Sequence, residues 1–164
     1  MVIETERLKL IFLNPIQLGL WIEYISVSEK ELHCSYEAEP MEGFFLDIVK
    51  KQLKVTANDS KNYLWHSFCC LLRKSDNIVV GSAHVKNIPN DKGEVEIGYG
   101  LGKEFEHHGY LTEAVSGMCI WALEQDIVLS VIAEMEIDGY ASQRILERCG
   151  FKKYRQDETI WWRP

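Results

Sequence analysis

The sequence has 164 residues, of which 46% are hydrophobic and 26% are charged, and its formal net charge is −7. These values are typical of a globular protein with its own core, so we expect a single domain over residues 1–164. The acidic balance argues against nucleic acid or an anionic membrane surface as partner, and it permits a cationic partner such as an amine or a basic peptide.

The first third of the chain predicts a strand followed by two helices. Residues 7–13, RLKLIFL, alternate as a strand does, and Pro15 after Asn14 is typical of a helix start. Apolar residues at helical spacing predict one helix over Ile16–Val27 and a second after Pro40. The apolar stripe of the second helix consists of Phe44, Phe45, Ile48, Val49 and Leu53.

The middle of the chain reads as three strands. Tyr63–Arg73 and Ile78–Lys86 are rich in aromatic and apolar residues and flank the polar turn KSDN, so they predict a hairpin. Val95–Leu101 is the next strand. Its glycines, Gly98 and Gly100, predict a bulge or the close approach of another backbone.

The C-terminal part alternates between helix and strand. Apolar spacing predicts a helix over Tyr110–Gln125, and the apolar run Ile127–Met135 predicts a buried, partly parallel strand. A short helix over Ser142–Arg148 follows, and a final hairpin is expected from Phe151–Arg155 and Thr159–Arg163. The whole order predicts a mixed α/β domain around one central sheet.

The stretch EIGYGLGKEFEHHGYLTE, residues 96–113, carries the clearest functional signal. A strand, a short loop with a glycine at its bend and a helix start place backbone N–H donors at the positive end of a helix dipole. Such an arrangement can bind phosphate. Taken alone, the same pattern is more commonly an ordinary connection with a helix cap.

Cysteines, histidines and the N-terminal segment suggest no metal, disulfide or membrane chemistry. The five cysteines are odd in number and lack C-x-x-C spacing, so we expect free thiols. His33, His66 and His84 lie in different elements without ligand spacing, so no metal is expected. The opening MVIETERLKL lacks an apolar signal region, and no apolar run reaches the roughly 20 residues that span a bilayer, which predicts a cytoplasmic protein.

Several segments form a pattern in a fixed order along the chain. They are the opening ETERLKL, the strands IVVGSAHV and EVEIGYGL, the turn HHGYLTEAV, and ASQRILERCGF near the end. The turn is similar to G-K-G-Y-A-T-E-A, and the last segment to A-S-x-R-V-L-E-K-x-G-F. Together they resemble the GNAT acyltransferases and, within them, the Rim-type branch that acetylates protein N-terminal amines.

The resemblance implies both a fold and an activity. The fold is a mostly antiparallel central sheet, splayed at a coenzyme A cleft and flanked by helices on both faces. The activity is acetyl-CoA-dependent N-acetylation by direct attack of an amine on the thioester. The acceptor is a protein N-terminus or a small amine, such as an antibiotic or a free amino acid. Trp161 and Trp162 must face opposite sides of the last strand, and an exposed one would suit a dimer contact or a wall of the acceptor pocket. We expect a monomer or a homodimer.

The resemblance also assigns the cofactor contacts. Backbone groups of Tyr99, Gly100 and Leu101 are expected to pair with the pantetheine arm as an added strand would. Backbone N–H groups of the loop and helix start are expected to hold the diphosphate. The residues of that loop and helix start are Glu106, His107, His108, Gly109, Tyr110, Leu111 and Thr112. The two histidines either help to neutralise phosphate or lie in solvent.

Two residues are candidate catalytic groups. Glu96 stands where several GNAT enzymes place a general base, which is needed because an ammonium must lose its proton before it attacks. Glu94 on the same face, or a water, is the competitor, and Glu96 is otherwise a surface partner of a lysine or arginine. Ser142 is expected to contact the cofactor and the departing thiolate, or else to cap its helix. Many relatives carry a tyrosine that acts as general acid at the position of Leu146, so the resemblance implies that this acid is absent here.

Three departures from the family pattern concern the cofactor site. Glu106 replaces a glutamine or arginine, Leu111 replaces a glycine or alanine, and Gly139 replaces an asparagine. An inward carboxylate on Glu106 would oppose a diphosphate, so we expect binding that is kept but weakened. The alternative function is therefore a regulatory or non-catalytic module that binds acetyl-CoA.

Overall fold

The computed structural model describes residues 1–164, which form a nine-stranded sheet with helices on both faces. The N-terminal elements are β1 (Val2–Glu4), β2 (Leu8–Phe12), α1 (Pro15–Glu23), α2 (Ile25–Leu32), β3 (Ser35–Tyr36), α3 (Gly43–Asn58) and the 3₁₀ helix η1 (Ser60–Trp65). The remaining elements are β4 (Phe68–Arg73), β5 (Ile78–Val85), β6 (Glu94–Leu101), the 3₁₀ helix η2 (Lys103–Phe105), α4 (Tyr110–Leu123), β7 (Ser130–Met135), α5 (Tyr140–Arg148), β8 (Lys152–Gln156) and β9 (Ile160–Arg163).

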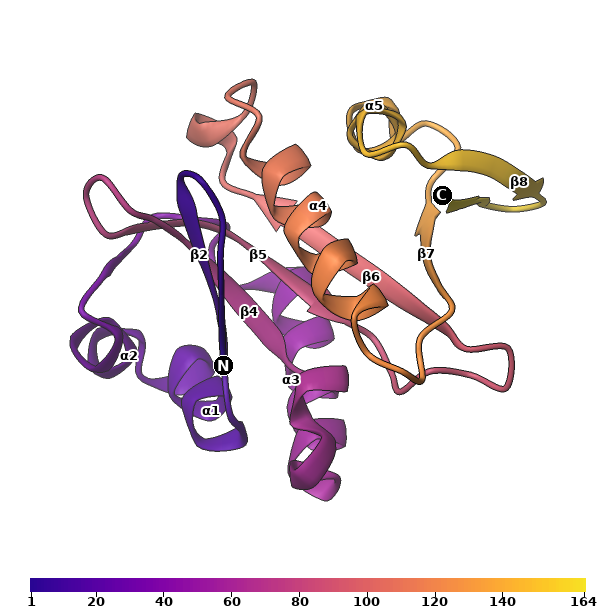
Figure 1. The fold of residues 1–164 in the computed structure, drawn as a ribbon. Coiled ribbons are helices and arrows are strands. Elements are labelled where there is room, and N and C mark those ends of the chain that lie inside the picture. The colour runs from indigo at the N-terminus through magenta and orange to yellow at the C-terminus, as the bar shows by residue number, and fades with distance from the viewer.

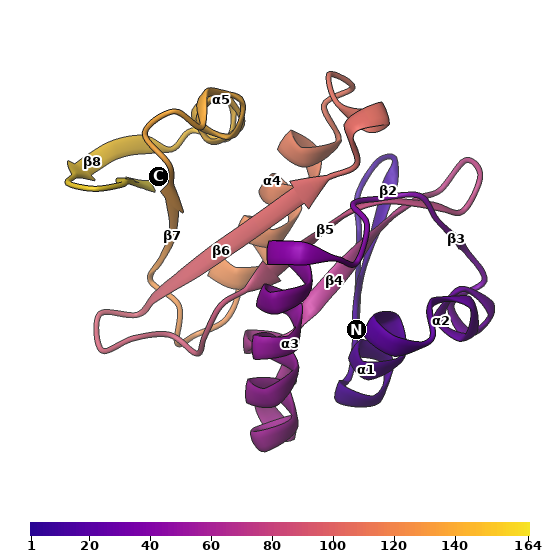
Figure 2. The same ribbon diagram turned by 180° about the vertical axis from the view of Figure 1, so that it is seen from behind.

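The sheet is mostly antiparallel, as the sequence predicts. Its strands are ordered β1-β2-β4-β5-β6-β7-β9-β8, with the short β3 beside β5. Only the β6–β7 and β3–β5 pairs are parallel. Helix α4 covers one face of the sheet (Figure 1), and α1 and α3 cover the other (Figure 2). The predicted mixed α/β architecture is therefore confirmed.

The first helical region begins as predicted but is divided in two. Asn14 caps α1: its side chain accepts from Gln17 N at 2.9 Å, and Gln17 Oε1 accepts from Asn14 N at 3.0 Å. A single helix over residues 16–27 is nevertheless wrong. Tyr24, with φ −138° and ψ 66°, leaves the helical region and separates α1 from α2.

Two predicted strands are too long at their N-terminal ends. Residues 63–65 belong to η1, where the Trp65 ring lies 5.1 Å from that of Trp121 in α4. Their apolar character therefore reflects packing of a 3₁₀ helix and not strand pairing. Strand β7 begins at Ser130, because Ile127 and Leu129 lie in the preceding turn and are 60% and 75% exposed.

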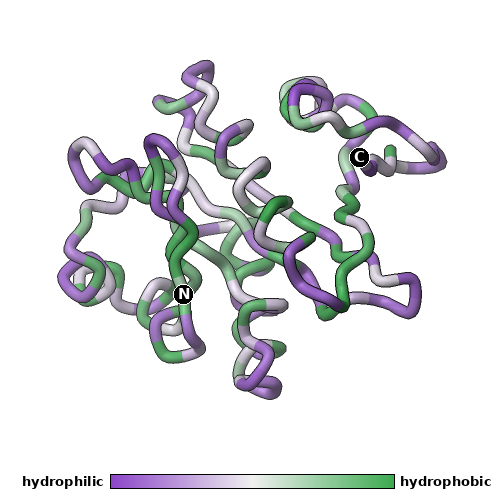
Figure 3. Tube along the Cα trace, viewed as in Figure 1, coloured by the Kyte–Doolittle hydropathy of each residue, from purple (hydrophilic) through white to green (hydrophobic).

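The two faces of the sheet have separate hydrophobic cores. The larger one lies under α4 and includes Leu71, Ile97 and Met118. The smaller one lies between the sheet and α1 and α3, and Trp21 is buried in it with its ring 5.6 Å from that of Phe68. Figure 3 shows hydrophobic residues along the central strands and hydrophilic residues at the loops. No helix combines the length and apolarity needed to cross a bilayer.

Candidate active site

Strand β6 parts from β7 halfway along its length. The parallel ladder joins Glu94–Ile97 to Ser130–Ala133 and ends there. On its other edge, β6 pairs with β5 in unbroken register from Ile97 to Leu101. The bulge predicted at Gly98 and Gly100 is therefore wrong, and the irregularity in this part of the sheet is the divergence of β6 and β7.

The register leaves backbone groups of β6 open toward this gap. Lys86 N donates to Glu96 O and Gly102 N donates to Val80 O, both at 2.9 Å, so even-numbered residues of β6 bond to β5. The N–H and C=O groups of Tyr99 and Leu101 consequently point to the β7 side, beyond the end of that ladder. They can accept an extended molecule as a further strand.

A pocket of about 230 Å³, here called the α5 pocket, lies beside this open edge. The backbone N–H groups at the start of α4 face it without intrahelical partners, because the first such bond runs from Glu113 N to Gly109 O at 3.1 Å. Thr112 Oγ1 is buried there without a partner. The lining residues are Tyr99, Gly100, Leu101, Glu106, His107, Gly109, Tyr110, Leu111, Thr112, Ala141, Ser142, Arg144, Ile145 and Arg148.

The loop before α4 needs residues that tolerate positive φ. Gly109 has φ 79° and His107 has φ 66°, and the His107 side chain is 92% exposed, with Nε2 3.9 Å from Glu106 Oε2. His108 does not line the pocket: its Nδ1 lies 3.2 Å from the carbonyl oxygen of Phe105. Of the two histidines, only His107 is placed where it could meet a bound anion.

An ion pair fixes this loop to the N-terminal strands. Arg7 Nε donates to Glu113 Oε2 at 2.7 Å, and Arg7 Nη1 donates to the carbonyl of His108 at 2.8 Å. Burial disfavours the Glu113 carboxylate, but hydrogen bonds from Thr5 and Arg7 outweigh it and hold the pKa of Glu113 below its ordinary value. The loop around Gly109 is therefore tied to the N-terminal strands by charged groups.

Helix α5 forms the opposite wall of the α5 pocket. It begins at Tyr140 with Gly139 as N-cap, so Ser142 lies inside the first turn and the capping role considered for it is wrong. The carbonyl of Ser142 accepts a hydrogen bond from Tyr99 OH at 3.1 Å, which ties α5 to β6. Burial raises the pKa of Tyr99 well above its usual range, so the phenol stays protonated. Leu146 is fully buried in the core.

Two arginines of this wall are absent from the residues selected from sequence. Arg144 and Arg148 are exposed, line the α5 pocket and form no ion pair. Their spacing of four residues places them on one face of α5, and this is the signal that could have identified them. Because they lie across from the N-terminus of α4, they add positive charge where an anion would bind.

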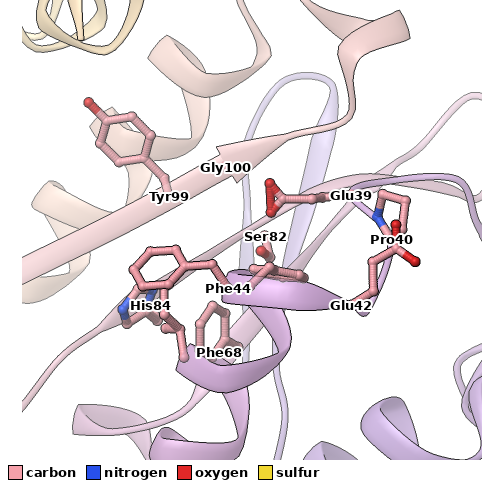
Figure 4. Close-up of a pocket in the computed structure, with 11 residues that line it drawn as sticks. Glu39, Pro40, Glu42, Phe44, Phe68, Ser82, His84, Tyr99 and Gly100 are labelled. Carbon is pink, nitrogen blue, oxygen red and sulfur yellow. The ribbon is translucent and has the colours of Figure 1, made fainter. Parts of the chain in front are cut away.

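A second pocket, of about 470 Å³, lies on the other side of β6 and is here called the α3 pocket. It shares Tyr99 and Gly100 with the α5 pocket, so the two are contiguous across the strand. Figure 4 shows the Tyr99 ring directed away from the other labelled side chains. The lining residues are Glu39, Pro40, Glu42, Phe44, Phe45, Ile48, Phe68, Ser82, His84, Tyr99 and Gly100.

His84 is the buried polar residue of the α3 pocket that sequence reasoning passed over. It is 8% exposed, and its ring stacks on that of Phe68 at 4.2 Å. Desolvation, with a contribution from Lys86, lowers the pKa of His84 to about 3, so the imidazole is neutral. Gly98 is required beside it, because a Cβ there would lie 2.4 Å from His84 Cε1. This close approach explains a glycine that the sequence marks as unusual.

The two candidate bases lie on the α3 face of β6, outside both pocket linings. Glu96 forms an ion pair with Lys86 and its side chain is 23% exposed. Glu94 accepts from Asn90 Nδ2 at 3.0 Å and so holds the turn that precedes β6. Glu96 is one alternation closer to Gly98 and Gly100 than Glu94 is, and it therefore stays the candidate nearer to the gap.

The remaining residues selected from sequence serve the structure. Trp162 is buried, whereas Trp161 is half-buried beneath the guanidinium of Arg155 at 4.6 Å, so the pair faces opposite sides as expected. All five cysteines are free. No group of three or more histidine, cysteine, aspartate or glutamate side chains is placed to hold a metal ion.

Comparison with known proteins gives a consistent result. The family model "Acetyltransferase (GNAT) domain" matches residues 25–152. The chain is 29% identical over 152 residues to the uncharacterized N-acetyltransferase YjdG of Bacillus subtilis (strain 168), covering 91% of this chain and 88% of that protein.

Solved structures with the same fold include two ribosomal-protein acetyltransferases. A putative ribosomal-protein-serine acetyltransferase from Vibrio cholerae has a TM-score of 0.69 at 15% identity, over 100% of this chain and 97% of that chain. The ribosomal L7/L12 α-N-protein acetyltransferase RimL, solved in complex with coenzyme A, has a TM-score of 0.68 at 12% identity, over 100% and 97% of the two chains.

Proposed function

Since this chain belongs to the GNAT acetyltransferase family, we propose that it transfers the acetyl group of acetyl-CoA to a primary amine of a small molecule or a peptide. The observation that carries the proposal is the pair of contiguous pockets on the two sides of β6. One offers donors and positive charge suited to an anionic cofactor, and the other offers space for an acceptor. Tyr99 and Gly100 mark the place where the two reactants would meet.

The α5 pocket fits coenzyme A in its chemistry. The free N–H groups at the start of α4 are donors for the diphosphate. Arg144 and Arg148 supply compensating charge from the opposite wall. The open backbone edge of Tyr99 and Leu101 suits the amides of the pantetheine arm. Acetyl-CoA would supply the acetyl group as a thioester.

The carboxylate of Glu106 opposes binding less than the sequence alone suggests. Its side chain is 52% exposed, so water screens the charge, and His107 Nε2 lies 3.9 Å from it. Leu111 lines the α5 pocket but is only 9% exposed, so most of the residue packs in the core and not against the phosphate donors. We therefore propose that both departures weaken the cofactor site modestly and do not abolish it.

The chain's residues must also handle two protons. Glu96 would take the proton of the acceptor ammonium, directly or through a water, so that the free amine can form the new C–N bond as the C–S bond breaks. The nitrogen loses its second proton as the C–S bond breaks. The departing thiolate would take a proton from the Ser142 hydroxyl, which lines the pocket from α5, and the proton released by the nitrogen would restore that hydroxyl through water. A backbone N–H of β6 on the open edge would stabilise the developing oxyanion.

The alternative, a module that binds acetyl-CoA without catalysis, has one supporting observation. Glu96 is paired with Lys86 and lines neither pocket. A calorimetric titration with acetyl-CoA, followed by thiol release across a panel of amines and basic peptides, separates the two functions. Binding with thiol release supports the enzyme, and binding without release on every amine supports the module. Absence of binding at millimolar acetyl-CoA would refute both.

A further inference from the structure

Two carboxylates of the α3 pocket have no partner within the chain. Glu39 and Glu42 line the pocket, and neither forms an ion pair or accepts a side-chain hydrogen bond. Glu42 is the N-cap residue of α3, but its side chain makes no capping bond. Helix capping therefore does not account for Glu42, which is exposed, whereas Glu39 is half-buried. Burial raises the pKa of Glu39, which reflects a partly desolvated charge that nothing compensates.

The inner wall of the same pocket holds a second unsatisfied polar group. His84 is more than nine-tenths buried, and its Nδ1 has no hydrogen-bond partner. Being neutral, the imidazole does not repel a cation, and one ring nitrogen can accept a hydrogen bond from an N–H. Figure 4 shows Glu39, Phe44 and His84 around this space. Polar groups at both ends of an apolar pocket indicate a ligand with polar groups at both ends.

Apolar side chains line the pocket between its two polar ends. Phe45 and Ile48 of α3 and Phe68 of β4 line the pocket there. Phe44 is 81% exposed at its lip, where its ring face is available to a cation. The pocket therefore offers contact to a short hydrocarbon segment as well as to charge.

The charge of the surrounding chain has the same sign as these two carboxylates. Apart from Glu39 and Glu42, residues 23–42 contain four glutamates and one lysine. The α5 pocket differs, because Arg144 and Arg148 line it. The two sides of β6 thus favour ligands of opposite charge, and the α3 side favours a cation.

We propose that the acceptor is an amine that carries a second positive charge, separated from the reacting nitrogen by an apolar segment. Glu39 and Glu42 bind the second cation, and Phe44 and Phe45 contact the apolar segment. His84 accepts a hydrogen bond from an N–H of the ligand. A diamine and a peptide N-terminus followed by a basic residue share this chemistry. The inference rests on the proposed acetyl transfer and specifies its acceptor.

The same charges select against acceptors that carry a carboxylate. A free amino acid or an acidic peptide would place a negative charge beside Glu39 and Glu42, where like charges repel. Three amines of equal length test this directly: cadaverine has a second cation, pentylamine has none, and δ-aminovalerate has an anion. We expect kcat/KM to fall in that order, with roughly tenfold between the first two, as for one charge-assisted contact.

The variant that tests the assignment is Glu39→Gln with Glu42→Gln. We expect the ratio of kcat/KM for cadaverine to that for pentylamine to fall roughly tenfold, because only the diamine uses these carboxylates. Glu37→Gln is the matched control: it removes an exposed glutamate of the same segment that lies outside the pocket, and the ratio should not change. A double variant that keeps the wild-type ratio would overturn the inference.

The source of the acceptor is distinguished by a second arm with the peptides Ala-Lys-Ala and Ala-Glu-Ala. A higher kcat/KM for the lysine peptide than for cadaverine indicates a peptide acceptor, and a lower one indicates a small polyamine. Both outcomes support an acceptor that carries a second positive charge. Calorimetric binding of cadaverine and pentylamine in the presence of coenzyme A gives the same comparison without turnover. Equal kcat/KM values for all three amines would refute this inference without affecting the proposed acetyl transfer. Failure to bind acetyl-CoA would sink the acetyl transfer on which it rests.

Discussion

Replacement of Gly109 with valine tests the assignment of the diphosphate loop. Gly109 lines the α5 pocket at the bend into α4, with φ 79°. For residues with a Cβ, this left-handed backbone conformation costs about 1–2 kcal/mol of conformational free energy, and β-branched residues are at the upper end. An added Cβ would lie 3.4 Å from Arg7 Nη2, an ordinary contact. The penalty therefore comes from the backbone and not from crowding.

The expected result is weaker binding of acetyl-CoA by about 5- to 30-fold. This range follows because the variant must regain the positive φ to present its N–H groups, and about 1.4 kcal/mol corresponds to tenfold in Kd. Calorimetry gives Kd directly, and the KM for acetyl-CoA should rise in parallel. Gly109→Ala should lie between the wild type and the valine variant.

Gly150→Val is the matched control. Gly150 has φ 84°, no atom lies within 4 Å of a Cβ built there, and it lines neither pocket. It should lose a similar amount of stability in urea unfolding without any change in Kd. If Gly109→Val lost stability in the same way and still bound acetyl-CoA as the wild type does, the loop would not hold the diphosphate.

Three further predictions concern the base, the cofactor charge and the support of the loop. Glu96→Gln should lower kcat by about 10²-fold or more, with unchanged Kd for acetyl-CoA. The kcat of Glu94→Gln should stay near that of the wild type. Full activity of Glu96→Gln at neutral pH would assign the general base to Glu94 or a water instead. Arg144→Gln should raise the KM for acetyl-CoA roughly threefold to tenfold and reduce the dependence of this KM on salt. Arg155→Gln, whose arginine does not line the pocket, should do neither. Because the pKa of Glu113 is lowered from 4.5 in the folded protein, its stabilisation is present above that pH and is lost as pH falls through the folded pKa. Urea midpoints of Glu113→Gln should therefore lie below wild type at neutral pH and converge with it once the pH has fallen below the folded pKa, and an undiminished difference in strong acid would contradict this.

The parts of the fold that could be predicted are those whose signal is local. Alternation in EVEIGYGL, the glycine at position 109 and the apolar spacing of α4 each depend on neighbours in sequence, and each leads to the observed element. Local signals also mislead. The glycines of β6 suggested a bulge, but one of them makes room for His84 from the adjacent strand. A sequence pattern cannot show which strand edge or side chain a glycine will face.

The α3 pocket could not be predicted for a similar reason. Glu39, Phe68 and His84 come from a loop and two strands and share no motif, and only the pairing of β4 with β5 brings the last two together. The apolar spacing around Tyr24 likewise gives no sign that the helix breaks there. The start of α5 was missed because its N-cap, Gly139, has no side chain to signal a cap.

The divergence of β6 and β7 has a mechanical consequence. The C-terminal unit, β7 to β9, is joined to the sheet by the short ladder between Glu94–Ile97 and Ser130–Ala133. Beyond this ladder it is held by the Tyr99–Ser142 hydrogen bond, the contacts of Cys149 with α4 and side-chain packing. A ligand lying along the gap would contact both the C-terminal unit and the rest of the sheet, so its binding energy would also oppose their separation. Amide exchange in β7 and α5 should then slow when acetyl-CoA is added.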